Sequence, residues 1–145
     1  MGTTRHPVAE RLGGEEVLKR EVRSDLELAD IIHDGLPYRT LDFVLSTDLV
    51  ELKEIHDLVA PRRTLAHRKE KQGTLSPEQS DRLARVVRMM GRAEDALGSR
   101  EKGQRWMGTP NRALGGKRPI ERLESDVGSR MVERILGRIE HGVYS

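Results

Sequence analysis

The chain has 145 residues, of which 35% are hydrophobic and 34% are charged, and its formal net charge is +2. It has no cysteine, which excludes disulfides and thiolate metal sites, and no apolar run near the roughly 20 residues that cross a bilayer. No hydrophobic stretch of signal-peptide length follows Met1 either, so we expect a cytoplasmic protein that does not enter a membrane.

Helical spacing of Leu, Val, Ile and Met recurs through most of the chain, and no segment alternates as a half-buried strand would. Residues 1–23 contain Pro7 and two consecutive glycines, so we predict a flexible N-terminal arm there, with at most one helical turn. The first helix is predicted to begin at Ser24, because Ser24 and Glu27 have the spacing of a capping box, and to end at Gly35. We therefore expect an all-α fold.

A helix-turn-helix is predicted in residues 51–72. The first helix has an inward stripe of Leu52, Ile55 and Val59 at spacings of three and four. A short turn follows, and Pro61 opens the second helix, where a missing backbone N–H costs nothing. Two helices joined in this way are typical of DNA-binding proteins, although the same geometry also occurs without DNA binding.

The second of these helices carries a localised positive charge. Residues 61–72 hold five Lys and Arg side chains against one acid, Glu70, which gives the segment a net charge of +4. The N-terminal residues of a recognition helix reach base edges while flanking cations contact phosphates, so we predict both kinds of DNA contact. The candidate base readers are Arg62, Arg63 and His67, the candidate phosphate contacts are Arg68, Lys69 and Lys71, and Thr64 completes the candidate DNA-binding set. The alternative is a solvated basic face without a ligand.

A long amphipathic helix is predicted next. Ser76, Pro77 and Gln79 supply an N-cap, a proline at the first helical position and a reciprocal side chain, and apolar residues then recur as far as Gly98. A last helix is predicted from Ser125 to His141. Its apolar residues recur every four positions, with one more beside them: Val127, Met131, Ile135 and Ile139, with Leu136.

Sites for catalysis or metal binding are not predicted. The five histidines are scattered, and none belongs to a His-Glu-x-x-His motif. Gly115, Gly116 and Lys117 are similar to the end of a phosphate-binding loop, but Arg118 stands where that motif needs Ser or Thr. No serine or acid is paired with a histidine in a recognisable nucleophile context. We therefore expect a protein that is not an enzyme, with no catalytic residue, no metal and no cofactor.

Longer motifs resemble a known family. The second half contains LSPEQSDRL, then WMGTPNRALGGKRPIERL, and at the end VGSRMVERILGRIEHGVYS; the first half contains LPYRTLDFV and APRRTLAHRKEKQG. Over residues 35–145 these motifs resemble the MbcA/ParS/Xre antitoxins of RES–Xre toxin–antitoxin pairs. The resemblance implies an Xre-type helix-turn-helix domain at 24–75, joined by the long helix to a helical toxin-binding domain at 76–145.

The same resemblance implies a function and an assembly. It implies a homodimer that neutralises a RES-domain toxin, an enzyme that depletes NAD, by covering the toxin's active-site cleft with its own C-terminal region. It also implies that the protein binds operator DNA and represses its operon, in the bacterial cytoplasm at a promoter in the nucleoid. Matching positions make these residues candidates for the toxin interface: Arg138, Glu140, Tyr144 and Ser145. Others become structural turn elements rather than contacts: Asn111, Leu114, Gly115 and Gly116.

Two further interpretations remain open. The chain could be a helix-turn-helix transcriptional regulator that has no toxin partner. It could also be a helical interaction module whose basic helix is only a solvated surface.

Overall fold

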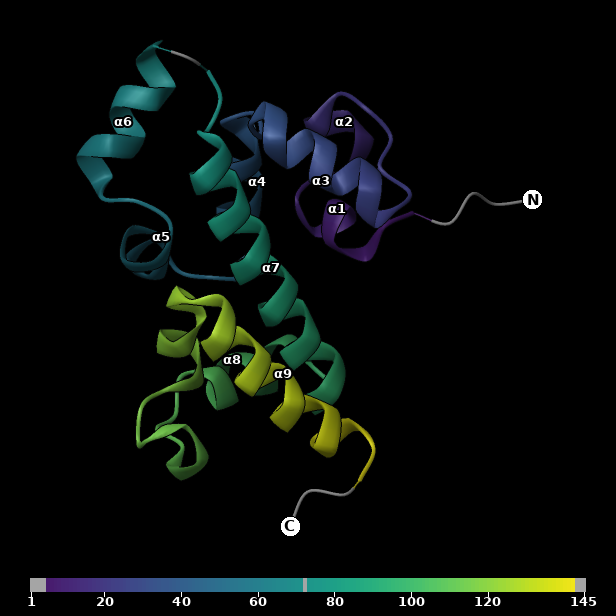
Figure 1. Ribbon diagram of the computed structural model, residues 1–145, viewed down its shortest axis with the longest axis vertical. Coiled ribbons are helices and arrows are strands. Elements are labelled where there is room, and N and C mark those ends of the chain that lie inside the picture. The colour runs from purple at the N-terminus through teal and green to yellow at the C-terminus, as the bar shows by residue number, and fades with distance from the viewer. Residues whose placement is uncertain (1–4, 72, 143–145) are drawn as a thin grey trace. The chain divides into compact units, whose positions relative to one another are not determined.

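The computed structural model describes residues 5–71 and 73–142, and these residues form helices and no strand (Figure 1). The all-α fold predicted from the sequence is confirmed. The chain divides into two compact units, residues 1–87 and 88–145, and this division falls inside the long helix α7 (Pro77–Leu97) rather than at its start. Within the described part of the chain, no helix is long and apolar enough to cross a membrane.

The first unit is built from short helices around an aliphatic core. It contains α1 (Pro7–Arg11), α2 (Gly14–Leu18), α3 (Asp25–Asp34), α4 (Arg39–Ser46), α5 (Leu52–Leu58), α6 (Arg62–Lys71) and the first part of α7. Its fully buried side chains include Leu12, Ile31, Leu36, Ile55 and Leu83. Burial of such side chains stabilises each by about 1.5–3 kcal/mol relative to exposure, so this core supplies the main folding energy of the unit.

The N-terminal segment is more ordered than the sequence predicts. Where we expected a flexible arm over residues 1–23, the described residues form α1 and α2, and they bury Val8, Leu12, Leu18 and Val22. That expectation is wrong for this part of the arm; residues 1–4 lie outside the described residues. Each helix has only five residues, which is too short to produce a recognisable helical period in the sequence.

Two side chains fasten this segment to the rest of the first unit. His6 caps α1, because its Nδ1 accepts a hydrogen bond from the backbone N–H of Val8 at 3.2 Å, while its Nε2 lies 2.7 Å from Oδ1 of Asp25 at the start of α3. The guanidinium of Arg39 in α4 donates to the carbonyl of Glu16 at 3.3 Å, at the end of α2. Both contacts satisfy backbone groups that a helix end leaves unpaired.

The helix starts predicted from capping motifs are confirmed. The Ser24 hydroxyl accepts from the backbone N–H of Glu27 at 3.1 Å, and α3 ends at Gly35, whose φ is +96°. At the start of α7, Ser76 and Gln79 bond reciprocally, at 3.1 Å from the Gln79 N–H to Ser76 Oγ and 2.9 Å from the Ser76 N–H to Gln79 Oε1. These contacts form within four residues, which explains why the sequence alone predicts them.

The second unit combines the end of α7 with α8 (Arg100–Met107), the 3₁₀ segments η1 (Arg112–Leu114) and η2 (Pro119–Glu124), and α9 (Asp126–Glu140). Its α9 packs closely on η2, and Gly128 makes this possible, because a Cβ there would overlap the backbone carbonyl of Arg122. The inward face of α9 consists of Gly128, Ser129, Val132, Ile135 and Leu136.

That inward face is rotated from the one expected. Val127 was predicted to share it but is 68% exposed, and Met131 and Ile139 are only half-buried. The close approach at Gly128 turns α9 so that the small residues Gly128 and Ser129 face inward at its first turn. An apolar residue at helical spacing is therefore not always a core residue.

Glu121 closes the first turn of η2. Its Oε2 accepts hydrogen bonds from the backbone N–H of Arg118 at 3.0 Å and from Nε of Arg118 at 3.3 Å. The backbone hydrogen bond, assisted by the Arg118 charge, holds the pKa of the Glu121 carboxyl below its ordinary value. Because the pKa is lower in the folded state, ionised Glu121 stabilises the fold above the unfolded-state pKa, and this stabilisation is lost as the pH falls through the folded-state pKa.

We therefore expect Glu121→Gln to reduce the free energy of unfolding at pH 7 and to lose this effect in acid. Urea titrations of wild type and Glu121→Gln from pH 7 down to pH 2 should at first give a constant difference in the free energy of unfolding. The difference should then shrink below about pH 4.3, where an unperturbed glutamate protonates. Glu124→Gln, which changes an exposed carboxylate on the same segment, is the matched control. A difference between wild type and Glu121→Gln that does not depend on pH would contradict this role.

Candidate functional site

Helices α5 and α6 and the turn between them form the predicted helix-turn-helix. Ile55 is completely buried and Val59 is 2% exposed, so these two residues anchor α5 as expected. Leu52, predicted to lie on the same stripe, is 52% exposed, and Glu54 is buried in its place. The turn is held from α7, where the guanidinium of Arg82 donates to the carbonyl of Val59 at 3.3 Å.

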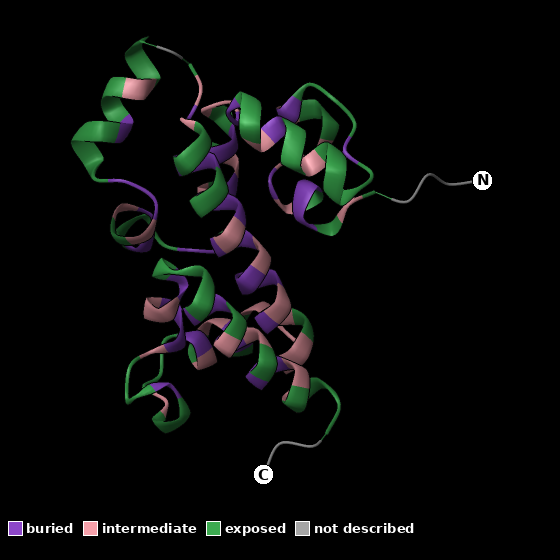
Figure 2. Ribbon diagram, in the orientation of Figure 1, coloured by how far each residue is buried: buried purple, intermediate pink, exposed green. Residues whose placement is uncertain are grey.

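Helix α6 is anchored through one apolar side chain and two cations. Leu65 is 2% exposed and is the only buried residue of the helix (Figure 2). Nε of Arg68 donates to the carbonyl of Thr74 at 3.0 Å, and Nζ of Lys69 lies 5.6 Å from the centre of the Tyr38 ring. The pKa of Tyr38 is raised above its ordinary value, mainly by burial and then by the charge of Asp42, so its ring stays neutral beneath the cation.

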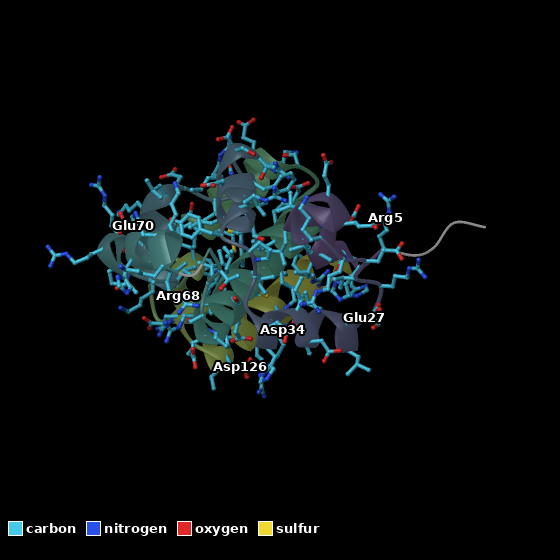
Figure 3. The ribbon with its side chains drawn as sticks, turned by 90° about the horizontal axis from the view of Figure 1, so that it is seen from above. Arg5, Glu27, Asp34, Arg68, Glu70 and Asp126 are labelled. Carbon is cyan, nitrogen blue, oxygen red and sulfur yellow. The ribbon has the colours of Figure 1, made fainter. Side chains whose placement is uncertain are left out.

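All the predicted DNA contacts except Arg68 are open to solvent. Arg62, Arg63, Thr64, His67, Lys69 and Lys71 are exposed, whereas Arg68 is half-buried. Arg63 and His67 stand two residues on either side of Leu65, hence about 160° from it around the helix axis, and so point away from the core. Figure 3 labels Arg68 and Glu70 among the side chains of this helix.

Two of the predicted phosphate contacts therefore also have structural roles. Arg68 and Lys69 hold α6 in place through Thr74 and Tyr38, which the sequence analysis did not single out. No local pattern could identify Tyr38 as a partner, because it is far from α6 in the chain, whereas Thr74 lies only six residues after Arg68. The sequence predicts the charges of α6 correctly but not the contacts that fix its position.

The charge of the first unit is concentrated in α6. Residues 1–57 contain 13 Asp and Glu against 7 Lys and Arg, while residues 61–72 carry a net charge of +4. A polyanion is therefore attracted to α6 and repelled by much of the preceding sequence. This asymmetry favours one orientation of the unit on a negatively charged ligand.

The two described residues of the predicted toxin interface, Arg138 and Glu140, lie on different sides of α9. Arg138 is exposed, but Oε1 of Glu140 accepts a hydrogen bond from Nη1 of Arg92 in α7 at 2.9 Å. Residues two apart on a helix are separated by about 200° around its axis, so Arg138 points away from α7 while Glu140 points towards it. Tyr144 and Ser145 lie outside the described residues.

The loop from Asn111 to Lys117 has the structural role that the family resemblance implies. Oδ1 of Asn111 accepts from the N–H of Ala113 at 2.9 Å, and the Asn111 carbonyl accepts from the N–H of Gly116 at 3.0 Å. Gly115 and Gly116 have φ values of +73° and +79°, which favour glycine. Leu114 is buried, and its carbonyl accepts two hydrogen bonds from the Arg122 guanidinium, at 2.8 and 3.0 Å.

Metal ligands do not cluster in the described residues. No group of three or more His, Asp or Glu side chains there has a geometry that could hold a metal ion. The exposed charges of the described residues include the cations of α6 in the first unit and those of α9 in the second.

Comparison with known proteins finds a matching domain family for each unit. Residues 27–88 match the Antitoxin Xre-like helix-turn-helix domain, and residues 92–142 match the Antitoxin Xre/MbcA/ParS C-terminal toxin-binding domain. A protein named Antitoxin Xre from Yersinia enterocolitica serotype O:8 / biotype 1B is 36% identical over 121 residues, which cover 81% of each chain. The chain belongs to the Xre antitoxin family.

Two further relatives of this antitoxin carry the same name. The Antitoxin Xre of Photorhabdus laumondii is 32% identical over 117 residues, covering 79% of each chain. That of Pseudomonas putida is 31% identical over 122 residues, covering 84% of this chain and 76% of the relative. The protein is thus an antitoxin of a toxin–antitoxin system, with a helix-turn-helix domain and a toxin-binding domain. Helices α1 and α2 lie outside both matched regions.

We expect Leu65→Ala to destabilise the helix-turn-helix of the antitoxin, because α6 has no other buried side chain. Loss of a fully buried leucine should lower the free energy of unfolding by about 2–5 kcal/mol, measured by urea denaturation followed by circular dichroism. Ala66→Ser, an exposed change on the same helix, should stay within about 0.5 kcal/mol of wild type. Equal stability of the two variants would show that Leu65 does not anchor α6.

Proposed function

We propose that this antitoxin neutralises a RES-domain toxin that degrades NAD and represses its own operon by binding operator DNA through α6. It would act as a homodimer in the bacterial cytoplasm, bound at its promoter in the nucleoid. The observation that carries the proposal is the pairing of an exposed basic helix with a domain of the toxin-binding family in one chain. Both activities are binding functions, and neither needs a metal, a cofactor or a catalytic side chain from this chain.

The DNA half of the proposal rests on the outward face of α6. In a helix-turn-helix the second helix lies in the major groove and its N-terminal residues reach base edges. Arg62, Arg63 and Thr64 occupy the first turn, and His67 follows one turn after Arg63 on the outward face. Arg guanidinium groups can bond to guanine O6 and N7 together, which makes Arg63 the principal candidate base reader.

The flanking cations would position the helix on the duplex. Lys71 is exposed at the end of α6, and Lys69 and Arg68 lie beside it while they contact Tyr38 and Thr74. Contacts from these cations to phosphates add affinity without sequence preference. A homodimer would present two such helices to two half-sites about one helical turn of DNA apart.

The toxin half of the proposal rests on the end of the chain. Arg138 is exposed, as is Arg134 one helical turn earlier, so α9 offers two cations on the side that faces away from α7. The C-terminal region, with Tyr144 and Ser145, would enter the toxin's active-site cleft and exclude its substrate. This assignment extends the family resemblance to particular positions of this chain.

Two alternatives make different predictions. A regulator without a toxin partner would not co-purify with the product of the neighbouring gene, whereas an antitoxin would, because the partners are encoded side by side. An interaction module with a merely solvated basic helix would not bind DNA with the steep salt dependence of phosphate contacts, where the slope is about 0.9 per neutralised phosphate on logarithmic axes.

For the DNA site, Arg62→Ala and Arg63→Ala should each weaken binding to a fragment of the antitoxin's own promoter by about 1–3 kcal/mol, because a bidentate base contact is lost. Gel-shift titration at a fixed salt concentration measures this. Lys102→Ala, which removes an exposed cation from the second unit, is the control for net charge and should leave affinity nearly unchanged. Unchanged affinity in both arginine variants would contradict recognition by α6.

For the toxin site, deletion of residues 142–145 should abolish neutralisation while promoter binding stays nearly intact. The deletion begins after α9 ends and removes none of its residues, and circular dichroism of the truncated chain checks that its helices are retained. Growth of cells that co-express the truncated chain with the neighbouring toxin measures neutralisation. Normal growth of those cells would overturn the assignment of the C-terminal region to the toxin cleft.

A further inference from the structure

Two ion pairs join α7 to α9 inside the second unit. Arg88 donates to Oε2 of Glu133 at 2.8 Å, and Arg92 donates to Oε1 of Glu140 at 2.9 Å. All four side chains are partly buried, with exposed fractions between 29% and 39%. The two arginines stand four residues apart on α7 and the two glutamates seven apart on α9, so each set lies on one face of its helix.

The position of Glu140 is unusual for an acid. It is the last residue of α9, where the partial negative charge of the helix C-terminus disfavours a carboxylate. An acid at this end is favourable only if a cation compensates it, and Arg92 does so directly. The pair therefore ties the final turn of α9 to α7, which is the longest helix of the chain.

The chain leaves α9 immediately after this pair. The N–H of His141 bonds to the Gly137 carbonyl at 3.0 Å, and the N–H of Gly142 bonds to the Ile139 carbonyl at 3.2 Å. Gly142 has a φ of +70°, which ends the helix and sets the direction in which the backbone departs. Any movement of the last turn changes the starting point and direction of the residues that follow.

We propose that Glu140 is a positioning residue for toxin neutralisation, which acts through Arg92 and not by contact with the toxin. The pair fixes the last turn of α9, from which the C-terminal residues would continue to the toxin's active-site cleft. This inference rests on the proposed function, because it assumes that those residues enter that cleft. It replaces the interface role that family resemblance gives to Glu140, and it leaves Arg138, on the opposite side of α9, as the exposed contact.

Charge reversal tests the inference. Arg92→Glu and Glu140→Arg should each weaken binding to the purified toxin of the neighbouring gene roughly five- to tenfold, because an attractive pair becomes a repulsive one. The double variant Arg92→Glu/Glu140→Arg restores an attractive pair and should bind within about twofold of wild type. Isothermal titration measures the three affinities, and circular dichroism confirms that each variant keeps its helices.

A direct contact from Glu140 to the toxin would give another result. Glu140→Arg and the double variant would then be equally weak while Arg92→Glu bound normally, and this pattern would overturn the inference. A wild-type chain that did not bind the toxin at all would overturn the proposed function and the inference with it.

The neighbouring pair provides the matched control. Arg88→Glu and Glu133→Arg, made singly, each turn a pair between the same two helices repulsive, but this pair lies about two turns before the end of α9, so each should leave toxin affinity within about twofold. Amide hydrogen exchange of the free antitoxin gives a readout that needs no toxin. Residues 137–142 should exchange several-fold faster in Arg92→Glu than in wild type, and they should recover in the double variant; unchanged exchange would overturn the inference independently.

Discussion

Helix α7 supplies the polar contacts on which both units depend. Its arginines hold neighbouring elements at their ends: Arg82 satisfies the carbonyl at the end of α5, and Arg92 compensates the acid at the end of α9. Helix ends leave backbone groups unpaired and carry partial charges, so a long side chain from a stable helix is well suited to fix them. The same helix therefore contributes to the position of the helix-turn-helix in one unit and of the end of α9 in the other.

The basic helix α6 combines weak anchoring with a strong charge. One leucine is buried, and two of its cations are used partly for docking, through Thr74 and Tyr38. The side chains opposite Leu65 are not used for packing. A helix that enters the major groove of DNA needs such an unused side. Residues 1–57 carry more acids than bases, so a polyanion is attracted to α6 and repelled by the sequence before it. This asymmetry favours one orientation of the unit on a polyanion.

Sequence reasoning succeeded where the physics is local and failed where it is not. The caps at Ser24 and Ser76 and the basic face of α6 all depend on residues within a few positions, and they were predicted correctly. Leu52 and Val127 have helical spacing but are exposed, because the rotation of a helix is set by its neighbours. Family resemblance places Glu140 and Arg138 together at the toxin interface, and this stays a prediction; the structure adds that Glu140 is bonded to Arg92 and that the two side chains lie on different sides of α9.

The amino-acid sequence alone determined the all-α class, the helix-turn-helix, the concentration of charge in α6 and the family to which the chain belongs. The first three follow from periodicity, capping motifs and composition, which depend on short stretches of residues, whereas the family follows from the resemblance of longer motifs to known antitoxins. Three features were decided only by the tertiary structure. Helices α1 and α2 are ordered, Arg68 and Lys69 hold α6 in place, and Arg92 donates a hydrogen bond to Glu140. Apart from the bond of Arg68 to the nearby Thr74, these depend on a partner from another part of the chain, and the distance between such partners is fixed only when the helices pack.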